Sequence, residues 1–202
     1  MKLATKPTRQ DTRVLQAVAA VFAAGLTIAV LSQIRFYTPL TPVPVTLQTL
    51  GVLLAGLTFG PRAGFLGGAL YLGFGAAGAP VFAGGQGGVG YMLAAREGIF
   101  APTLGYLLTF PFAAYVVGIL HQRFGRSGLY AVLGASAAGS AIILTGGYCW
   151  LAIQYSLLLG IPAGIVLGFT KGVLPFVVVE CAKVMAAATV ARETERLLQT
   201  RW

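Results

Sequence analysis

An acidic and a basic side chain lie together inside the last long apolar run of this chain. Glu180 and Lys183 are three residues apart, so on a helix they would share one face, with the acidic residue toward the N-terminus. A charge at the centre of a bilayer costs about 2.5 to 3.5 kcal/mol, so such residues usually face a bundle interior or a cavity. The pair therefore predicts either a polar ligand site or a structural ion pair, and in both cases it points inward.

A glycine-rich segment is the second candidate site. Between Pro80 and Tyr91 the chain reads PVFAGGQGGVGY, in which Gln86 is the polar side chain among the glycines. A glycine backbone can approach a ligand closely because no side chain stands in the way. The aromatic flanks favour a ligand site over the alternative, a flexible extracellular connection. The candidate ligand contacts in this segment are Phe82, Gly85, Gln86 and Gly87.

Several kinds of catalytic site have no residues to support them. The sequence contains no G-x-x-x-x-G-K-[ST] motif, so any ATP energy must come from another subunit. It has a single histidine, His121, which we expect to be a solvated loop residue, and five acidic residues that form no metal-binding cluster. We therefore expect no catalytic residue, no metal site and no cofactor, and an enzyme is not favoured.

The composition places these candidate residues in a membrane. The chain has 202 residues, of which 57% are hydrophobic and 9% are charged, and its mean hydropathy is +0.83; a soluble domain is about 25% charged. A bilayer core about 30 Å thick needs roughly 20 apolar residues per helix, so this length accommodates about six crossings. The prediction is an all-α integral membrane protein, in which residues 1–202 form a single bundle of six transmembrane helices.

The apolar runs give the expected helices and their connections. The second and third runs are separated only by Gly60-Pro61-Arg62, so a tight helical hairpin is expected there. The stretch 156–170 is apolar but broken by glycine and proline, so it is either a loop dipping into the membrane or an extension of a neighbouring helix. The six predicted helices span residues 14–34, 45–60, 63–82, 100–120, 129–156 and 173–191.

Basic residues alternate between the two sides that this topology defines. Cytoplasmic loops carry the excess of Lys and Arg, so both termini, the basic residues 1–13 and the tail 192–202, should be cytoplasmic. Because the basic residues lie in short clusters between apolar runs, membrane orientation explains the net charge of +9 better than nucleic-acid binding does. One side carries Lys2, Lys6, Arg9, Arg13, Arg62, Arg123, Arg126, Arg192, Arg196 and Arg201, and the other carries Arg35, Arg96 and Lys171.

Small residues spaced four apart are typical of close helix contacts within lipid. The first helix has two overlapping pairs, which suit a partner protein and packing inside the chain about equally. Gly64 and Gly68 form a pair in the third helix, for which internal packing is favoured. The two pairs in the first helix are Ala19 with Ala23 and Ala20 with Ala24.

Four segments of the chain, in this order, resemble the BioY family, the biotin-specific substrate-capture (S) components of energy-coupling-factor (ECF) vitamin transporters. The resemblance covers most of residues 12–190. The matching segments are TPVPVTLQT at 41–49, LAGLTFGPR at 54–62, PVFAGGQGG at 80–88 and PTLGYLL at 102–108.

The resemblance implies a six-helix bundle that holds biotin near the extracellular face of the plasma membrane. Glu180 and Lys183 match the family's acidic residue and lysine that meet the ligand, although the family usually has Asp where Glu180 stands. Thr46 and Tyr106, in the matching segments, join the expected biotin contacts, and the proline-rich segment 38–49 is expected to cap the site.

The same resemblance implies partners. The alanine pairs of the first helix match the family motif that meets the transmembrane coupling subunit, which works with ATPase subunits in a lipid membrane. The alternative function is a self-sufficient small-molecule carrier or channel, which would also use an intramembrane charged pair.

Overall fold

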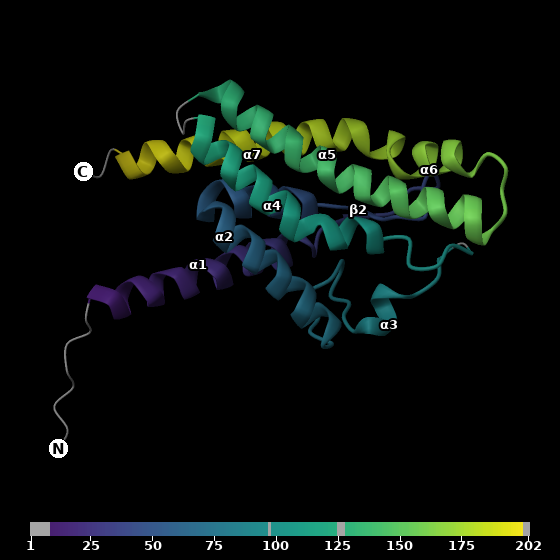
Figure 1. Cartoon of the computed structure of the whole chain (residues 1–202), viewed down its shortest axis with the longest axis horizontal. Coiled ribbons are helices and arrows are strands. Elements are labelled where there is room, and N and C mark those ends of the chain that lie inside the picture. The colour runs from purple at the N-terminus through teal and green to yellow at the C-terminus, as the bar shows by residue number, and fades with distance from the viewer. Residues whose placement is uncertain (1–8, 97, 125–127, 200–202) are drawn as a thin grey trace, which may run out of the picture.

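The structure is a computed structural model that describes residues 9–96, 98–124 and 128–199, and it is a helical bundle, which confirms the predicted all-α class (Figure 1). In the described residues, five helical stretches are long and apolar enough to cross a membrane. The helices are α1 (Arg9–Leu31), α2 (Gln48–Ala76), α3 (Val89–Met92), α4 (Leu104–Phe124), α5 (Leu129–Ile153), a π-helical turn (Gln154–Leu158), α6 (Gly164–Gly172) and α7 (Leu174–Gln199). Between α1 and α2, the two-residue strands β1 (Arg35–Phe36) and β2 (Val45–Thr46) pair antiparallel.

The element α2 is a folded hairpin rather than one straight helix. Gly60 interrupts it with φ 82° and ψ 177°, and Pro61 follows. Gln48 Nε2 donates to Tyr71 Oη at 2.5 Å across the hairpin, although 23 residues of straight helix would separate two residues by about 35 Å. The helical hairpin predicted at Gly60-Pro61-Arg62 is therefore present. It explains why the single element α2 covers two of the predicted helices.

Glycines allow the hairpin to pack directly against α4. A Cβ atom added at Gly56 would lie 2.4 Å from the carbonyl oxygen of Ala114. One added at Gly64 would lie 3.2 Å from the Ala114 Cβ, and one at Gly68 would lie 3.1 Å from Pro111. Gly64 and Gly68 thus pack inside the chain, as expected, because bulkier residues would force the two helices apart.

The buried face of α7 carries both of its intramembrane charges. Five buried residues of α7 are spaced three or four apart, which places them on one side of the helix. They are Phe176, Glu180, Lys183, Ala187 and Ala191. Glu180 and Lys183 are each only 4% exposed, so both point into the bundle as the sequence predicted.

Some predicted boundaries are wrong. The third predicted helix was expected to reach residue 82, but α2 ends at Ala76, because Gly78 adopts φ 105° and starts a loop. The stretch 156–170 is helical only at its two ends, since the π-helical turn extends α5 to Leu158, α6 begins at Gly164, and residues 159–163 between them form a non-helical turn. The prediction that His121 is a solvated loop residue is also wrong, since it lies on α4 and is 3% exposed.

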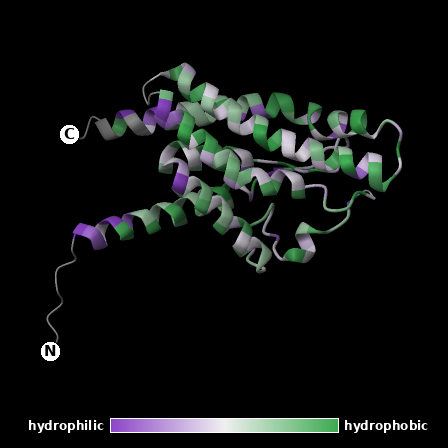
Figure 2. Ribbon diagram, in the orientation of Figure 1, coloured by the Kyte–Doolittle hydropathy of each residue, from purple (hydrophilic) through white to green (hydrophobic). Residues whose placement is uncertain are grey.

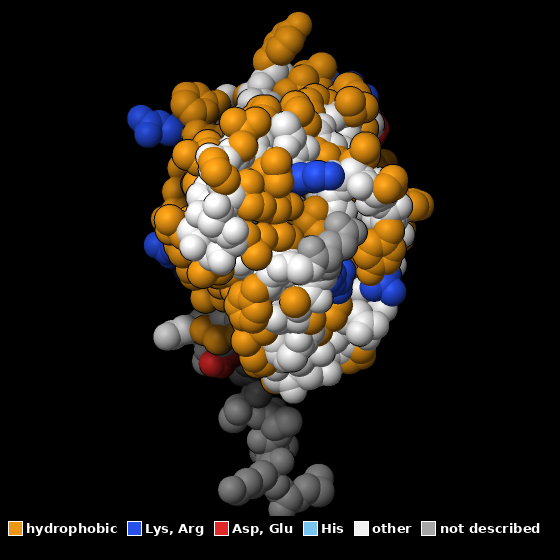
Figure 3. Space-filling model, turned by 90° about the vertical axis from the view of Figure 1, so that its right-hand side faces the viewer, with side chains coloured by type: hydrophobic (Ala, Val, Ile, Leu, Met, Phe, Trp, Pro, Cys, Tyr) orange, Lys and Arg blue, Asp and Glu red, His pale blue; other side chains and the backbone are white. Residues whose placement is uncertain are grey.

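The bundle has one hydrophilic end, where α1 begins and α7 ends (Figure 2). Arg9 and Arg13 lie at the start of α1, Arg62 in the hairpin turn and Arg123 in the last turn of α4. Figure 3 looks onto the opposite end, which is largely apolar with scattered basic side chains. Four basic residues of the charge argument lie outside the described residues; they are Lys2, Lys6, Arg126 and Arg201.

Candidate functional site

A cavity opens among α2, α4, α5 and α7, and its roughly 550 Å³ of empty space includes space open to solvent. Five of the eight predicted ligand contacts line it together, although they come from four separate parts of the sequence. Those five are Thr46, Phe82, Tyr106, Glu180 and Lys183.

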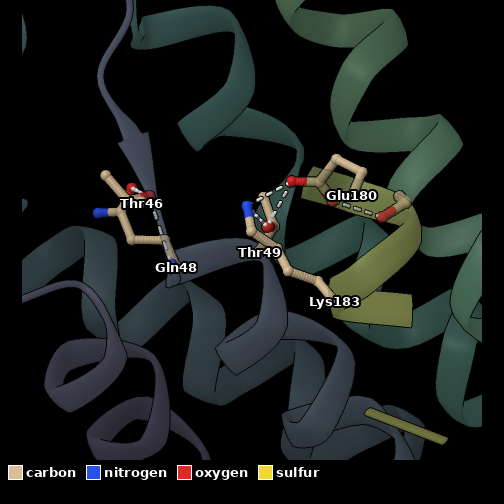
Figure 4. A network of polar contacts seen from close by, with 6 residues as sticks. Thr46, Gln48, Thr49, Glu180 and Lys183 are labelled. Carbon is tan, nitrogen blue, oxygen red and sulfur yellow. Dashed lines mark hydrogen bonds and ion pairs between the residues drawn. The ribbon is translucent and has the colours of Figure 1, made fainter. Parts of the chain in front are cut away.

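Glu180, Lys183 and Thr49 form the polar floor of the cavity (Figure 4), and Ser140 binds Glu180 from a third helix. Glu180 Oε1 accepts from Lys183 Nζ at 2.5 Å and from Thr49 Oγ1 at 2.8 Å. Glu180 Oε2 accepts from Ser140 Oγ at 2.6 Å. Lys183 Nζ also donates to Thr49 Oγ1 at 2.8 Å, so this hydroxyl accepts from one charge and donates to the other. The buried charges are therefore paired and hydrogen-bonded, as a poorly solvated site requires.

A second polar network lies on the wall formed by the start of α2. Thr46 Oγ1 donates to Gln48 Oε1 at 3.2 Å, and Gln48 Nε2 donates to the Tyr71 hydroxyl. Both Thr46 and Gln48 line the cavity. The segment 41–46 before them is buried throughout. This agrees with the expectation that the proline-rich segment covers the site.

Aromatic and aliphatic side chains form the rest of the wall. Phe82 is fully buried, lies edge-on to Tyr71 with ring centroids 5.5 Å apart, and stacks on Tyr91 at 5.8 Å. Tyr106 donates its hydroxyl proton to the Gly172 carbonyl at 2.7 Å, so this side chain is held in place from α6. An apolar cavity with a few fixed polar groups is the usual form of a small-molecule site.

The glycine-rich segment contributes less than its composition suggested. Gly85, Gln86 and Gly87 do not line the cavity, and the Gln86 side chain is exposed. Gly84 and Gly85 adopt φ 67° and 74°. The glycines thus serve the turn that aims Phe82 inward, because positive φ is easily adopted only by glycine.

Two buried polar atoms at the loop side of the cavity have no hydrogen-bond partner in the described part of the chain. They are the Tyr91 hydroxyl and Arg96 Nη1. Tyr91 lines the cavity, and the Arg96 guanidinium lies over the Tyr91 ring, 5.0 Å from its centroid. Unpaired buried polar groups are costly, so this pair is suited to an anionic ligand group.

The four alanines of α1 differ in exposure. Ala19 is exposed, and Ala20 and Ala23 are half-buried. Ala24 is fully buried, and its Cβ would lie 2.6 Å from a Cβ added at Gly67. Ala24 therefore packs against α2 within the chain and is not available to a partner.

Sequence reasoning did not single out Thr49 and Ser140, nor the apolar wall residues Phe110, Ile143 and Phe176. Thr49 ends one of the four segments that carry the family resemblance, which was a usable signal. Ser140 is a small residue in an apolar helix, and in such a helix a residue that faces the bundle interior looks like a lipid-facing one.

Comparison with known proteins finds similar chains among biotin transporters. A protein of Pyrococcus horikoshii named as a probable biotin transporter BioY is 36% identical over 154 residues, which cover 76% of this chain and 82% of that protein. The biotin transporter BioY of Rhizobium etli is 36% identical over 162 residues, covering 75% and 77% of the two chains. That of Thermotoga maritima is 34% identical over 159 residues, covering 79% and 85%.

A solved structure shares the fold. The crystal structure of the S component for biotin from an ECF-type ABC transporter superposes with a TM-score of 0.75, covers 95% of each chain and is 21% identical in sequence. The family model described as the BioY family matches residues 4–200. On this match, which spans nearly the whole sequence, the chain belongs to the BioY family.

Proposed function

We propose that this protein captures biotin in the cavity above its polar floor and serves as the substrate-binding S component of an ECF-type transporter. The membrane helices, the family and the named relatives support this function. Biotin is then the transported ligand rather than a cofactor, and the chain carries out no chemical reaction.

The remaining hydrogen-bonding capacity of the polar floor carries the proposal. Each carboxylate oxygen can accept about two hydrogen bonds and an ammonium group can donate three. Among the described residues, Glu180 Oε1 accepts two and Oε2 accepts one, whereas Lys183 Nζ donates two. One acceptor site on Glu180 Oε2 and one donor on Lys183 Nζ therefore remain within the same ion pair, which complements an N–H next to a C=O, as in the ureido ring of biotin.

The other end of biotin suits the loop side of the cavity. Its carboxylate could accept from the Tyr91 hydroxyl and from Arg96 Nη1, two of the buried groups that have no hydrogen-bond partner among the described residues. Between these ends, Phe82, Tyr106 and Phe110 offer an apolar wall to the thioether ring and the aliphatic tail. In this orientation Gln86, Gly85 and Gly87 shape the loop and do not touch the ligand.

We further propose six crossings of the plasma membrane, with the two arms of the α2 hairpin counted separately. Both termini are then cytoplasmic, because the hydrophilic end of the bundle holds the start of α1 and the end of α7. The cavity lies toward the extracellular side, where biotin would be captured.

The partner surface would lie on α1. Ala19, Ala20 and Ala23 are accessible on this helix, and small residues allow a second helix to approach closely in lipid. We expect this face to meet the transmembrane coupling subunit, which would carry the ATPase subunits.

Replacing Ala19 and Ala23 by leucine should abolish co-purification with the coupling subunit and leave biotin affinity unchanged, because both alanines lie outside the cavity. Val18→Leu, on the exposed face of the same helix, is the matched control. Lost biotin affinity with intact assembly would show that these alanines support the fold instead.

The function itself is tested by retention of radiolabelled biotin on cells that express the chain. Unlabelled biotin should displace the label, whereas diaminobiotin, which lacks the urea carbonyl, should compete at least about tenfold less well because Lys183 loses its acceptor. Equal competition by diaminobiotin would contradict the proposed role of the polar floor. In proteoliposomes, uptake by this chain alone would favour a self-sufficient carrier.

A further inference from the structure

The loop over the cavity, residues 77–88 between α2 and α3, is held by the chain that follows α1. We call these residues the Phe82 loop, because Phe82 and Ala83 in it line the cavity and are buried. Ser32 Oγ lies 2.5 Å from the Val81 carbonyl oxygen, and the Gly84 N–H donates to the Ser32 carbonyl at 3.3 Å. Arg35 Nη1 donates to the Ala83 carbonyl at 2.9 Å.

The fit between Arg35 and Gly84 is close. Gly84 has φ 67°, and a Cβ atom at this position would overlap the Arg35 guanidinium. The guanidinium therefore lies directly on the loop backbone, at a position that only glycine leaves open.

Arg35 also holds the second part of the cover. Its backbone pairs with Thr46 in the β1–β2 ribbon, and Thr46 lines the cavity. Arg35 thus holds the Phe82 loop through its side chain and the proline-rich segment through its main chain. Both segments supply cavity-lining residues: Phe82 and Ala83 come from the loop, and Val43, Pro44 and Thr46 come from the proline-rich segment.

We propose that Arg35, supported by Ser32, is a positioning residue that keeps both cover segments closed and so sets how long a bound ligand stays. The identity of the ligand rests on the proposed function, but the closure does not. The competing role for a cation at this end of the molecule is attraction of an anionic ligand, which would act on the association rate and weaken with salt.

Closure is tested without a ligand by thiol labelling. Ala83→Cys is placed in a Cys149→Ala, Cys181→Ala background and exposed to a water-soluble maleimide. Arg35→Ala should raise the labelling rate at least about fivefold, since the loop loses a charge-assisted hydrogen bond. Lys171→Ala removes a cation from the last turn of α6 and should leave the rate unchanged. Equal rates with and without Arg35 would overturn the proposal.

Ligand retention is tested by dissociation of radiolabelled biotin after dilution into unlabelled biotin. Arg35→Ala should accelerate dissociation at least about fivefold with little change in association. Gly84→Ala should have the same effect, because its methyl group displaces the guanidinium, and Arg35→Lys should be intermediate. Slower association with unchanged dissociation would assign Arg35 to ligand attraction and overturn the proposal. If the unmodified protein does not bind biotin, the proposed function fails and the labelling experiment still decides the role of Arg35.

Discussion

At the scale of single residues, Glu180 is held in place by donors from three helices. Lys183 on its own helix, Thr49 on α2 and Ser140 on α5 fix both carboxylate oxygens before any ligand arrives. Fixing the polar groups in advance lowers the entropy lost on binding. The Glu180 side chain is therefore held by a network that spans α2, α5 and α7.

Glu180→Gln and Lys183→Met should each weaken biotin binding at least about tenfold, or roughly 1.4 kcal/mol, because each removes a hydrogen bond to a charged group. Each should also lower the thermal stability in detergent, since the remaining charge is buried without its partner. Thermal unfolding and biotin titration of the same samples measure both effects. Normal affinity in either folded variant would contradict the ligand site.

Ser140→Ala separates the positioning of Glu180 from its charge. This variant removes the donor to Glu180 Oε2 and leaves the ion pair with Lys183 intact. We expect biotin affinity to fall about three- to tenfold with the ion pair retained, as measured by biotin titration. Ala137→Ser, on the same helix, is the control and should not change the affinity.

At the scale of helices, the sequence predicts the features that depend on a few neighbouring residues, such as a turn or the direction of a charged side chain. The hairpin at Gly60-Pro61-Arg62 follows from a residue with positive φ and a proline, and the inward direction of Glu180 and Lys183 follows from the cost of charge in lipid. Phe110 and Ile143 carry no such signal, because lipid and cavity both favour apolar side chains. The sequence predicts ligand contacts at Gly85 and Gly87, whereas positive φ at Gly85 and the close approach of Gly87 to the Ala79 carbonyl indicate a tight turn.

Close packing of α2 on α4 is tested with two glycines of the same element. Gly56→Val should lower the free energy of unfolding by about 1–3 kcal/mol, since its side chain would collide with the Ala114 backbone. Gly73→Ala meets nothing within 4 Å and should be neutral or stabilising. Thermal unfolding of both variants in detergent measures the difference, and equal stability would contradict this packing.

At the scale of the whole molecule, basic residues at one end and the cavity toward the other define an orientation. In a background without Cys149 and Cys181, cysteines at Gln86 and Lys171 should react with an impermeant maleimide added outside intact cells. Cysteines at Arg62 and Arg123 should react only after permeabilisation, because the proposed orientation places their end of the bundle in the cytoplasm. The reverse pattern would contradict the orientation and the charge argument together.

Calorimetric titration of the purified protein with biotin tests the central claim most directly, when the double variant Glu180→Gln, Lys183→Met is titrated beside it. The double variant removes both charges, so it should unfold at nearly the same temperature as the unmodified protein. We predict saturable binding of one biotin to the unmodified protein and at least about tenfold weaker binding to the double variant. Near-normal affinity in the folded double variant would contradict the account and leave Glu180 and Lys183 as a structural ion pair.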